Sequence, residues 1–273
     1  MQSTSDQFVE YYATESLSPE TLERFAGIKR AVEHAAQLFG AAQRPWRVAD
    51  IGCGAGTQCA LWARDGHEVD GVDINAELIE LGRARVAAEK LAVRLEVGSA
   101  TSLPWPDASM DVCLCPELLE HVADWRSVLS EVVRVLRPGG ITYLSTTNSL
   151  CPVQQEFDLP GYSWYPARLK RHYERLATTT RPELVNHAKY PAVNWFTYYG
   201  LRDELAKQGF RCLDRFDIAA AVDRGALRNS LLGAVRALPP LRFLAQVATA
   251  GTIVFAQKTA TQERAAVVGV ASV

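Results

Sequence analysis

The sequence predicts an α/β protein with a doubly wound, mainly parallel sheet covered by helices on both faces. Apolar strand-like runs alternate with helix-like segments as far as residue 147. Acidic or small polar residues also stand where predicted strands end, namely Asp50, Asp73, Ser99 and Glu117. Because ligands of such sheets bind at the carboxyl ends of the strands, these residues predict a site at that edge.

The expected elements follow in order along the chain. A first helix begins at Pro19, with Ser18 as its N-cap, and ends at Gly40. Hydrophobic spacing and turn residues predict the others. Strands are expected at 48–51, 67–74, 93–97, 110–115, 141–146, 210–218 and 252–257, and helices at 57–64, 75–90, 117–122, 125–136 and 200–208.

Composition limits the class of protein. The chain has 273 residues, 48% of them hydrophobic, which suits one domain with insertions. A formal net charge of −2 argues against a nucleic-acid partner. Six cysteines without a CxxC pair favour free thiols in a reducing cytoplasm. No signal peptide is expected in residues 1–10, and no apolar run reaches the ~18 residues of a membrane span.

Residues 1–258 are predicted to form a single domain, with residues 1–44 as an N-terminal helical cap and 259–273 as a flexible tail. Residues 148–200, rich in proline and aromatic residues, are expected to be a lid or substrate-binding insertion, whose aromatic residues either bind an aromatic substrate or form the lid's own core. The apolar insertion at 219–250 fits a peripheral membrane helix for a lipid-linked substrate, a buried flap or a homodimer contact.

A glycine-rich turn follows the strand at 48–51. Asp50 precedes glycines at 52, 54 and 56, and a helix is expected from Thr57. Glycines permit close approach of a ligand to the backbone, and the helix start offers free N–H groups, so the turn predicts a nucleotide-type cofactor site. A dinucleotide fingerprint would need GxGxxG, whereas the pattern here is Asp-x-Gly-x-Gly-x-Gly.

Together with Leu-Pro-Trp-Pro-Asp at 103–107 and Arg-Pro-Gly-Gly at 137–140, this pattern resembles the class I S-adenosylmethionine-dependent methyltransferases over residues 45–147 and 200–258. The resemblance implies a Rossmann-like, seven-stranded sheet with a reversed last strand, and S-adenosyl-L-methionine as cofactor. It implies that Asp50 binds the methionine amine and that Asp73 binds the ribose hydroxyls. Further contacts would come from Gly52, Cys53, Gly54, Gly56, Ile74 against the adenine, Ser99, Ala100 and Pro116.

A second constellation follows the fourth strand. Glu117, Glu120 and His121 stand at i, i+3 and i+4, so a helix would bring them onto one face. Two carboxylates and an imidazole suit a divalent metal such as Mn²⁺, Fe²⁺, Co²⁺ or Zn²⁺ better than Mg²⁺. The alternative is a metal-free site in which His121 or His187 is the general base.

Glu-x-x-Glu-His resembles the O-methyltransferases of ubiquinone biosynthesis and the small-RNA 2′-O-methyltransferases, in which a further histidine from the insertion completes a metal site. The resemblance implies His187 as the fourth ligand, with His172 as its substitute. A metal held there would lower the pKa of a substrate hydroxyl. Glu117, His121 and His187 are therefore the expected catalytic residues.

The expected activity is O-methylation of a small or lipid-like molecule, such as a phenol, catechol or sugar. A metal-free N- or C-methyltransferase with a histidine base is the first alternative. A cofactor-binding scaffold without activity is the alternative from another class. The net charge of −2 argues against the RNA substrate.

Overall fold

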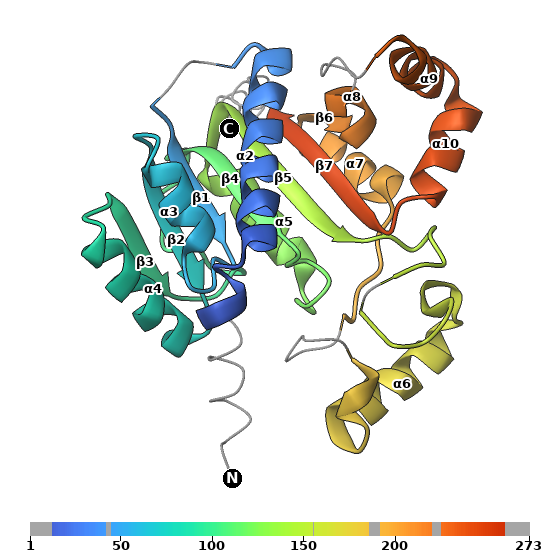
Figure 1. The fold of residues 1–273 in the computed structure, drawn as a ribbon, viewed down its shortest axis with the longest axis horizontal. Helices are drawn as coiled ribbons and strands as arrows, with labels where there is room; N and C mark the ends of the chain where they lie inside the picture. The colour runs from blue at the N-terminus through green and yellow to red at the C-terminus, as the bar shows by residue number, and fades with distance from the viewer. Residues whose placement is uncertain (1–12, 42–44, 155, 186–191, 220–224, 260–273) are drawn as a thin grey trace, which may run out of the picture.

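The computed structural model describes residues 13–41, 45–154, 156–185, 192–219 and 225–259. Seven strands form one sheet in the order β3-β2-β1-β4-β5-β7-β6, with helices on both of its faces (Figure 1). The strands are β1 (Arg47–Ile51), β2 (Glu68–Asp73), β3 (Val93–Val97), β4 (Met110–Pro116), β5 (Leu136–Thr147), β6 (Phe210–Asp214) and β7 (Gly251–Lys258).

The sheet is parallel from β3 to β5, and β7 runs antiparallel to both β5 and β6. The strand order reverses at β1, which pairs with β2 on one side and β4 on the other, so that Asp50 lies between Gly71 and Leu114. Such a reversal opens a crevice at the carboxyl ends of the strands. The predicted fold class, including the reversed last strand, is confirmed.

Two hydrophobic cores fill the space between the sheet and its helices. The first core joins the sheet to α5 (Trp125–Val135) and α7 (Tyr198–Lys207). The second joins it to α2 (Pro19–Phe39), α3 (Thr57–Ala63), α4 (Ala76–Ala88) and α8 (Arg215–Ala219). Because both faces are covered, the central strands are almost wholly apolar and buried, as parallel strands require.

Helix α2 has the boundaries that its caps predict. The Ser18 side chain accepts a hydrogen bond from Thr21 N, Pro19 occupies the first turn, and Gly40 ends the helix at a φ of 66°. A left-handed residue at this place is accessible to glycine at little cost. The buried side of the helix consists of Ile28, Lys29, Val32, Ala35, Ala36 and Phe39. Residues 1–12 of the expected N-terminal cap lie outside the described residues.

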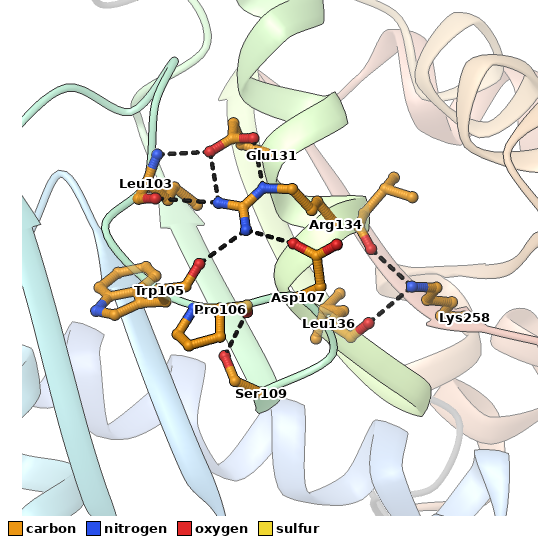
Figure 2. A network of polar contacts seen from close by, with 10 residues as sticks. Leu103, Trp105, Pro106, Asp107, Ser109, Glu131, Arg134, Leu136 and Lys258 are labelled. Carbon is orange, nitrogen blue, oxygen red and sulfur yellow. Dashed lines mark hydrogen bonds and ion pairs between the residues drawn. The ribbon is translucent and has the colours of Figure 1, made fainter.

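The Leu-Pro-Trp-Pro-Asp loop is fixed to α5 by one arginine (Figure 2). Arg134 donates hydrogen bonds to the carbonyls of Leu103 and Trp105, and it forms ion pairs with Asp107 and Glu131. Glu131 in turn accepts from Leu103 N at 2.6 Å. A planar guanidinium can bind several acceptors at once. We infer that this motif holds in place the loop that leads into β4, and that it has a structural role rather than a ligand-binding one.

The start of β5 differs from the prediction. The turn expected at 137–140 belongs to the strand, whose pairing with β4 shifts register between Met110 and Val112. Gly139 in this stretch has a φ of 82°. Lys258, at the end of β7, donates to the carbonyls of Val133 and Leu136, so the last strand also holds the end of α5 (Figure 2).

Strand β6 ends at Asp214, four residues earlier than predicted, and α8 follows at once. Asp214 Oδ1 accepts from Phe216 N and Asp217 N, while Asp217 Oδ2 accepts from Asp214 N. This reciprocal pair is a capping box, and it begins a helix where the apolar pattern alone indicated a continued strand.

The insertion at 148–200 contains η1 (Tyr162–Trp164), α6 (Ala167–Thr179) and η2 (Pro182–Leu184). Phe157, Tyr162, Ala177 and Leu184 form a small core of their own, in which the rings of Phe157 and Tyr162 stack with centroids 4.0 Å apart. Of the two interpretations of the aromatic residues, these packing contacts favour a core for the insertion itself. Helix α6 stands apart from the sheet (Figure 1).

The second insertion forms α9 (Ala226–Ala237) and α10 (Pro239–Val247). Helix α9 buries none of its residues, and Leu227 is 86% exposed. The buried-flap interpretation is therefore wrong for α9, while the lipid and homodimer contacts stay predictions. Among the described residues, no helix has the length and apolar character needed to cross a membrane. Residues 260–273 of the expected tail lie outside the described part of the chain.

Candidate active site

The glycine loop lies at the carboxyl edge of the sheet, between the ends of β1 and β2. The N–H groups of Gly52 and Cys53 both donate to Val72 O, and Gly54 N donates to Asp73 Oδ2 at 2.8 Å. Gly54 has a φ of 52°, a conformation that costs glycine little. A Cβ atom on Gly54 would meet only Leu78 at 4.0 Å, so this face of the loop is open to a ligand.

Gly56 leaves room for a neighbouring side chain, and its contact with a cofactor stays a prediction. A Cβ atom there would lie 2.8 Å from Leu95 Cδ1, so the close approach is made by a β3 side chain. The side chain of Cys53 is only 9% exposed and belongs to the core, which leaves its backbone as the part able to contact a cofactor.

Asp50 lies beneath the loop, 2% exposed. Its carboxylate accepts hydrogen bonds from Gln58 Nε2 at 3.2 Å and Cys59 Sγ at 3.3 Å, both on α3. Burial raises the pKa of this carboxyl group to about 7. These contacts show how Asp50 holds the start of α3 against β1, and its contact with a methionine amine stays a prediction.

The end of β2 presents one polar and one apolar group. Asp73 Oδ1 accepts from Asn75 N at 2.8 Å, and its other oxygen is bound to the glycine loop, so the carboxylate is held in place. Ile74 is 76% exposed although it is large and apolar. Asp73 and Ile74 thus stand together at the end of β2, and their contacts with the ribose and the adenine stay predictions. Ser99 and Ala100 follow β3, where Ser99 Oγ lies 2.8 Å from Thr101 Oγ1.

Residues 117–122 form turns rather than the predicted helix. Glu117 adopts a φ of 47°, and its N–H donates to Ser145 O at the end of β5. The insertion supplies further partners, because Asn194 Nδ2 donates to the carbonyls of Leu119 and Val122. Glu117, Glu120 and His121 therefore do not share the face of a helix, and this prediction is wrong.

The turns nevertheless bring three carboxylates together. One oxygen from each of Glu117, Glu120 and Glu156 lies within 4.8 Å of the others. Glu120 is fully buried, its Oε2 accepts from Thr146 Oγ1 at 2.8 Å, and its Oε1 finds no hydrogen-bond partner among the described residues. Burial and the neighbouring Glu117 raise the pKa of Glu120 well above its ordinary value, and the same two causes raise that of Glu156 to about 7.

None of the expected histidines belongs to this group as far as the structure describes it. His121 is half-buried and lies outside the three-carboxylate group. His172 is exposed on α6, with its ring near that of Tyr173, and His187 lies outside the described residues. Glu156 was missed because nothing in its spacing marks it. It is one of two acidic residues between β5 and α6, and only the folded insertion places it beside β4.

The glycine loop, Asp73 and the carboxylate group all lie within or beside the segment that matches a family model. Residues 49–144 match the model described as a methyltransferase domain. Residues 49–144 therefore form a methyltransferase domain. The resemblance stated from the sequence is thereby confirmed, and this methyltransferase can be compared with others of known name.

Two of the curated relatives have names that refer to quinones. The chain is 34% identical over 116 residues to the demethylmenaquinone methyltransferase of Deinococcus radiodurans, covering 42% of this chain and 48% of that protein. It is 31% identical over 186 residues to the ubiquinone biosynthesis O-methyltransferase of Brucella anthropi, covering 65% and 66%. The chain spans about half the length of most of the curated relatives that it matches.

Solved structures agree with the fold of this methyltransferase. A Pyrococcus horikoshii protein superposes with a TM-score of 0.56 at 18% identity, covering 94% of this chain and all of the other. An S-adenosylmethionine-dependent methyltransferase from Mesorhizobium loti gives 0.52 at 19% identity, covering 84% and 98%. At such identities the likeness supports the shared architecture and nothing finer.

Proposed function

We propose that this methyltransferase transfers a methyl group from S-adenosyl-L-methionine to a hydroxyl oxygen of a small molecule. The observation that carries the proposal is the place of the three-carboxylate group. It stands at the end of β4, the strand paired with β1, whose end forms the glycine loop. The name of the Brucella anthropi relative, an O-methyltransferase, supports oxygen as the acceptor atom.

In this proposal the cofactor supplies an electrophilic methyl group, and the protein's own task is to align an oxygen behind it. Asp73, already fixed by Gly54 and Asn75, would accept hydrogen bonds from the ribose hydroxyls. Ile74 would cover the adenine, which explains why so large an apolar side chain is exposed. Glu117 and Glu156 would orient the acceptor hydroxyl from the opposite side.

The three carboxylates also fit a divalent metal. Glu120 Oε1 is buried without a hydrogen-bond partner among the described residues, and such an atom is stabilised by a cation. Because the described donors are all oxygens, they suit Mg²⁺ or Mn²⁺, which revises the earlier preference for softer ions. Bound there, the metal would lower the pKa of the acceptor hydroxyl.

The metal-free alternative has a specific observation in its favour. Burial and the charge of Glu117 raise the pKa of Glu156 to about 7, the range in which a carboxylate acts as a general base near neutral pH. In that case Glu156 takes the hydroxyl proton, in place of the histidines expected from the sequence.

A titration tests the cofactor. Calorimetry of the intact chain is expected to show a one-to-one complex with S-adenosylhomocysteine and none with NAD⁺, because the Asp-x-Gly-x-Gly-x-Gly spacing of the glycine loop departs from the GxGxxG of a dinucleotide site. Transfer of labelled methyl from S-adenosyl-L-methionine to catechol or a catechol acid then tests the reaction. If neither S-adenosyl compound bound, the proposed function would be wrong and an inactive scaffold would replace it.

Removal of metal separates the two mechanisms. With excess EDTA, methyl transfer is expected to fall at least about tenfold and to return with Mg²⁺ or Mn²⁺, because an ion on these carboxylates stabilises the acceptor oxygen as an anion. Binding of S-adenosylhomocysteine serves as the control and should be unchanged. Full activity in EDTA contradicts the metal and leaves Glu156 as the base.

A further inference from the structure

A pocket of about 320 Å³ opens beside Glu117. It lies between α2, β5, β7 and the start of α8, with apolar walls from Ile28, Ala31, Ile253 and Phe255. Its polar lining includes Arg24, Arg215, Tyr143 and Ser145. Ligand pockets span roughly 300–1,000 Å³, so this one suits a single-ring molecule rather than a long chain.

Arg215 is a largely buried cation that lacks a carboxylate partner among the described residues. Asp214, directly before it, and Asp217, two residues after it, both form ion pairs with Arg242 instead. The guanidinium of Arg215 donates to Gly251 O, while its Nε is buried without a hydrogen-bond partner in the described structure. Burial lowers the pKa of Arg215, which reflects the cost of holding this charge away from water. An anion in the pocket would offset that cost.

Arg24 brings a second cation to the same pocket from α2. It is exposed, lies over the ring of Phe25 at 4.9 Å, and forms no ion pair with any residue that the structure describes. Tyr143 lines the same pocket as both arginines. Its pKa is raised to about 12, chiefly by burial and also by the charge of Glu117, while a hydrogen bond with Ser145 and the charges of Arg215 and Arg24 act in the opposite direction.

We propose that Arg24 and Arg215 form a subsite for a carboxylate group of the methyl-accepting molecule, whose hydroxyl end lies toward Glu117. The lining carries the guanidiniums of Arg24 and Arg215 and the carboxylate of Glu117, so its net charge is one positive unit (two minus one). A ligand with a single negative charge would neutralise it. The planar fork of arginine suits a carboxylate, and the apolar walls suit the ring that carries it. The placement of the ligand's hydroxyl near Glu117 rests on the proposed function, whereas the placement of its carboxylate near the two arginines rests on the pocket alone.

Calorimetry with a matched pair of probes tests the subsite. For the parent chain, 3,4-dihydroxybenzoate is expected to bind at least about tenfold more tightly than 3,4-dihydroxybenzamide, as the gain of a charge-assisted hydrogen bond requires. Arg24→Ala should remove most of that preference and leave binding of the amide unchanged. Arg24 is exposed, so this variant should fold normally. Arg215→Gln, which keeps a donor for Gly251 O, should reduce the preference by a similar or larger factor.

Arg30→Ala is the matched control, because Arg30 is an exposed arginine on the same helix that pairs with Glu23 and does not line the pocket. Equal affinities for the acid and the amide in the parent chain would overturn the subsite, as would a preference that survives Arg24→Ala. Inorganic phosphate is also titrated as a competitor of 3,4-dihydroxybenzoate. If phosphate bound the subsite more tightly than the benzoate does, the carboxylate assignment would be overturned. S-adenosylhomocysteine, titrated into the same samples, reports on the proposed function separately.

Discussion

Asp73→Asn is expected to weaken the binding of S-adenosylhomocysteine by about 10- to 100-fold. The carboxylate of Asp73 already accepts from Gly54 N and Asn75 N, and the ribose hydroxyls would add further hydrogen bonds to it. A hydrogen bond to a charged acceptor contributes about 1.5–3 kcal/mol, and the neutral amide would lose part of each. Calorimetry at neutral pH measures the change.

Glu80→Gln is the matched control, because Glu80 is an exposed acid on α4 that pairs with Arg83. Its affinity for S-adenosylhomocysteine should equal that of the parent chain. An unchanged affinity in Asp73→Asn, with the fold intact by circular dichroism, would mean that the end of β2 does not bind the ribose.

Glu120→Gln is expected to lower methyl transfer by at least about 100-fold while leaving the free energy of unfolding at pH 7 unchanged or higher. A hundredfold loss corresponds to about 2.7 kcal/mol of transition-state stabilisation. The amide keeps an oxygen for Thr146 Oγ1 but cannot supply the buried negative charge that the site would need. Steady-state turnover and urea unfolding measure the two effects.

The pH dependence of stability gives this variant a second readout. Burial raises the pKa of Glu120 in the folded protein above its ordinary value of 4.5, so the folded state binds more protons than the unfolded chain. Without metal, the free energy of unfolding should therefore fall as the pH rises above about 4.5, and less steeply in Glu120→Gln. Glu183→Gln, an exposed control in the insertion, should show the parent slope. A Glu120→Gln enzyme with full turnover would contradict the role of this carboxylate.

The sequence predicts those parts of the fold that local chemistry determines. Ser18 and Gly40 mark α2 because capping depends on neighbouring residues alone. Asn75 likewise marks α4, where its side chain accepts from Glu77 N and Leu78 N. The sequence also predicts β1 and β4, which lead to Asp50 and Glu117, because buried parallel strands are continuous apolar runs.

The candidate site escapes prediction where distant segments decide the local structure. Residues 117–122 have helical spacing, yet Asn194, 75 residues beyond Leu119, takes up the carbonyls that a helix would use. Glu156 joins Glu117 and Glu120 only through the path of the insertion. Arg24 and Arg215 are 191 residues apart in the sequence (215 minus 24), so no pattern in either segment indicates their shared pocket.

The position of β7 has a consequence for the order of assembly. This strand lies between β5 and β6, and its register joins Ile141 to Gln257, so more than a hundred residues must be synthesised before the pair can form. Contacts between residues so far apart in the sequence form late, and they make folding slower. During translation, β6 has no neighbour in the sheet until β7 has left the ribosome, and the wall formed by Gly251, Ile253 and Phe255 is completed at the same moment. The nascent chain therefore acquires its arginine-lined pocket only in the final step of synthesis of the sheet, after the glycine loop has been made.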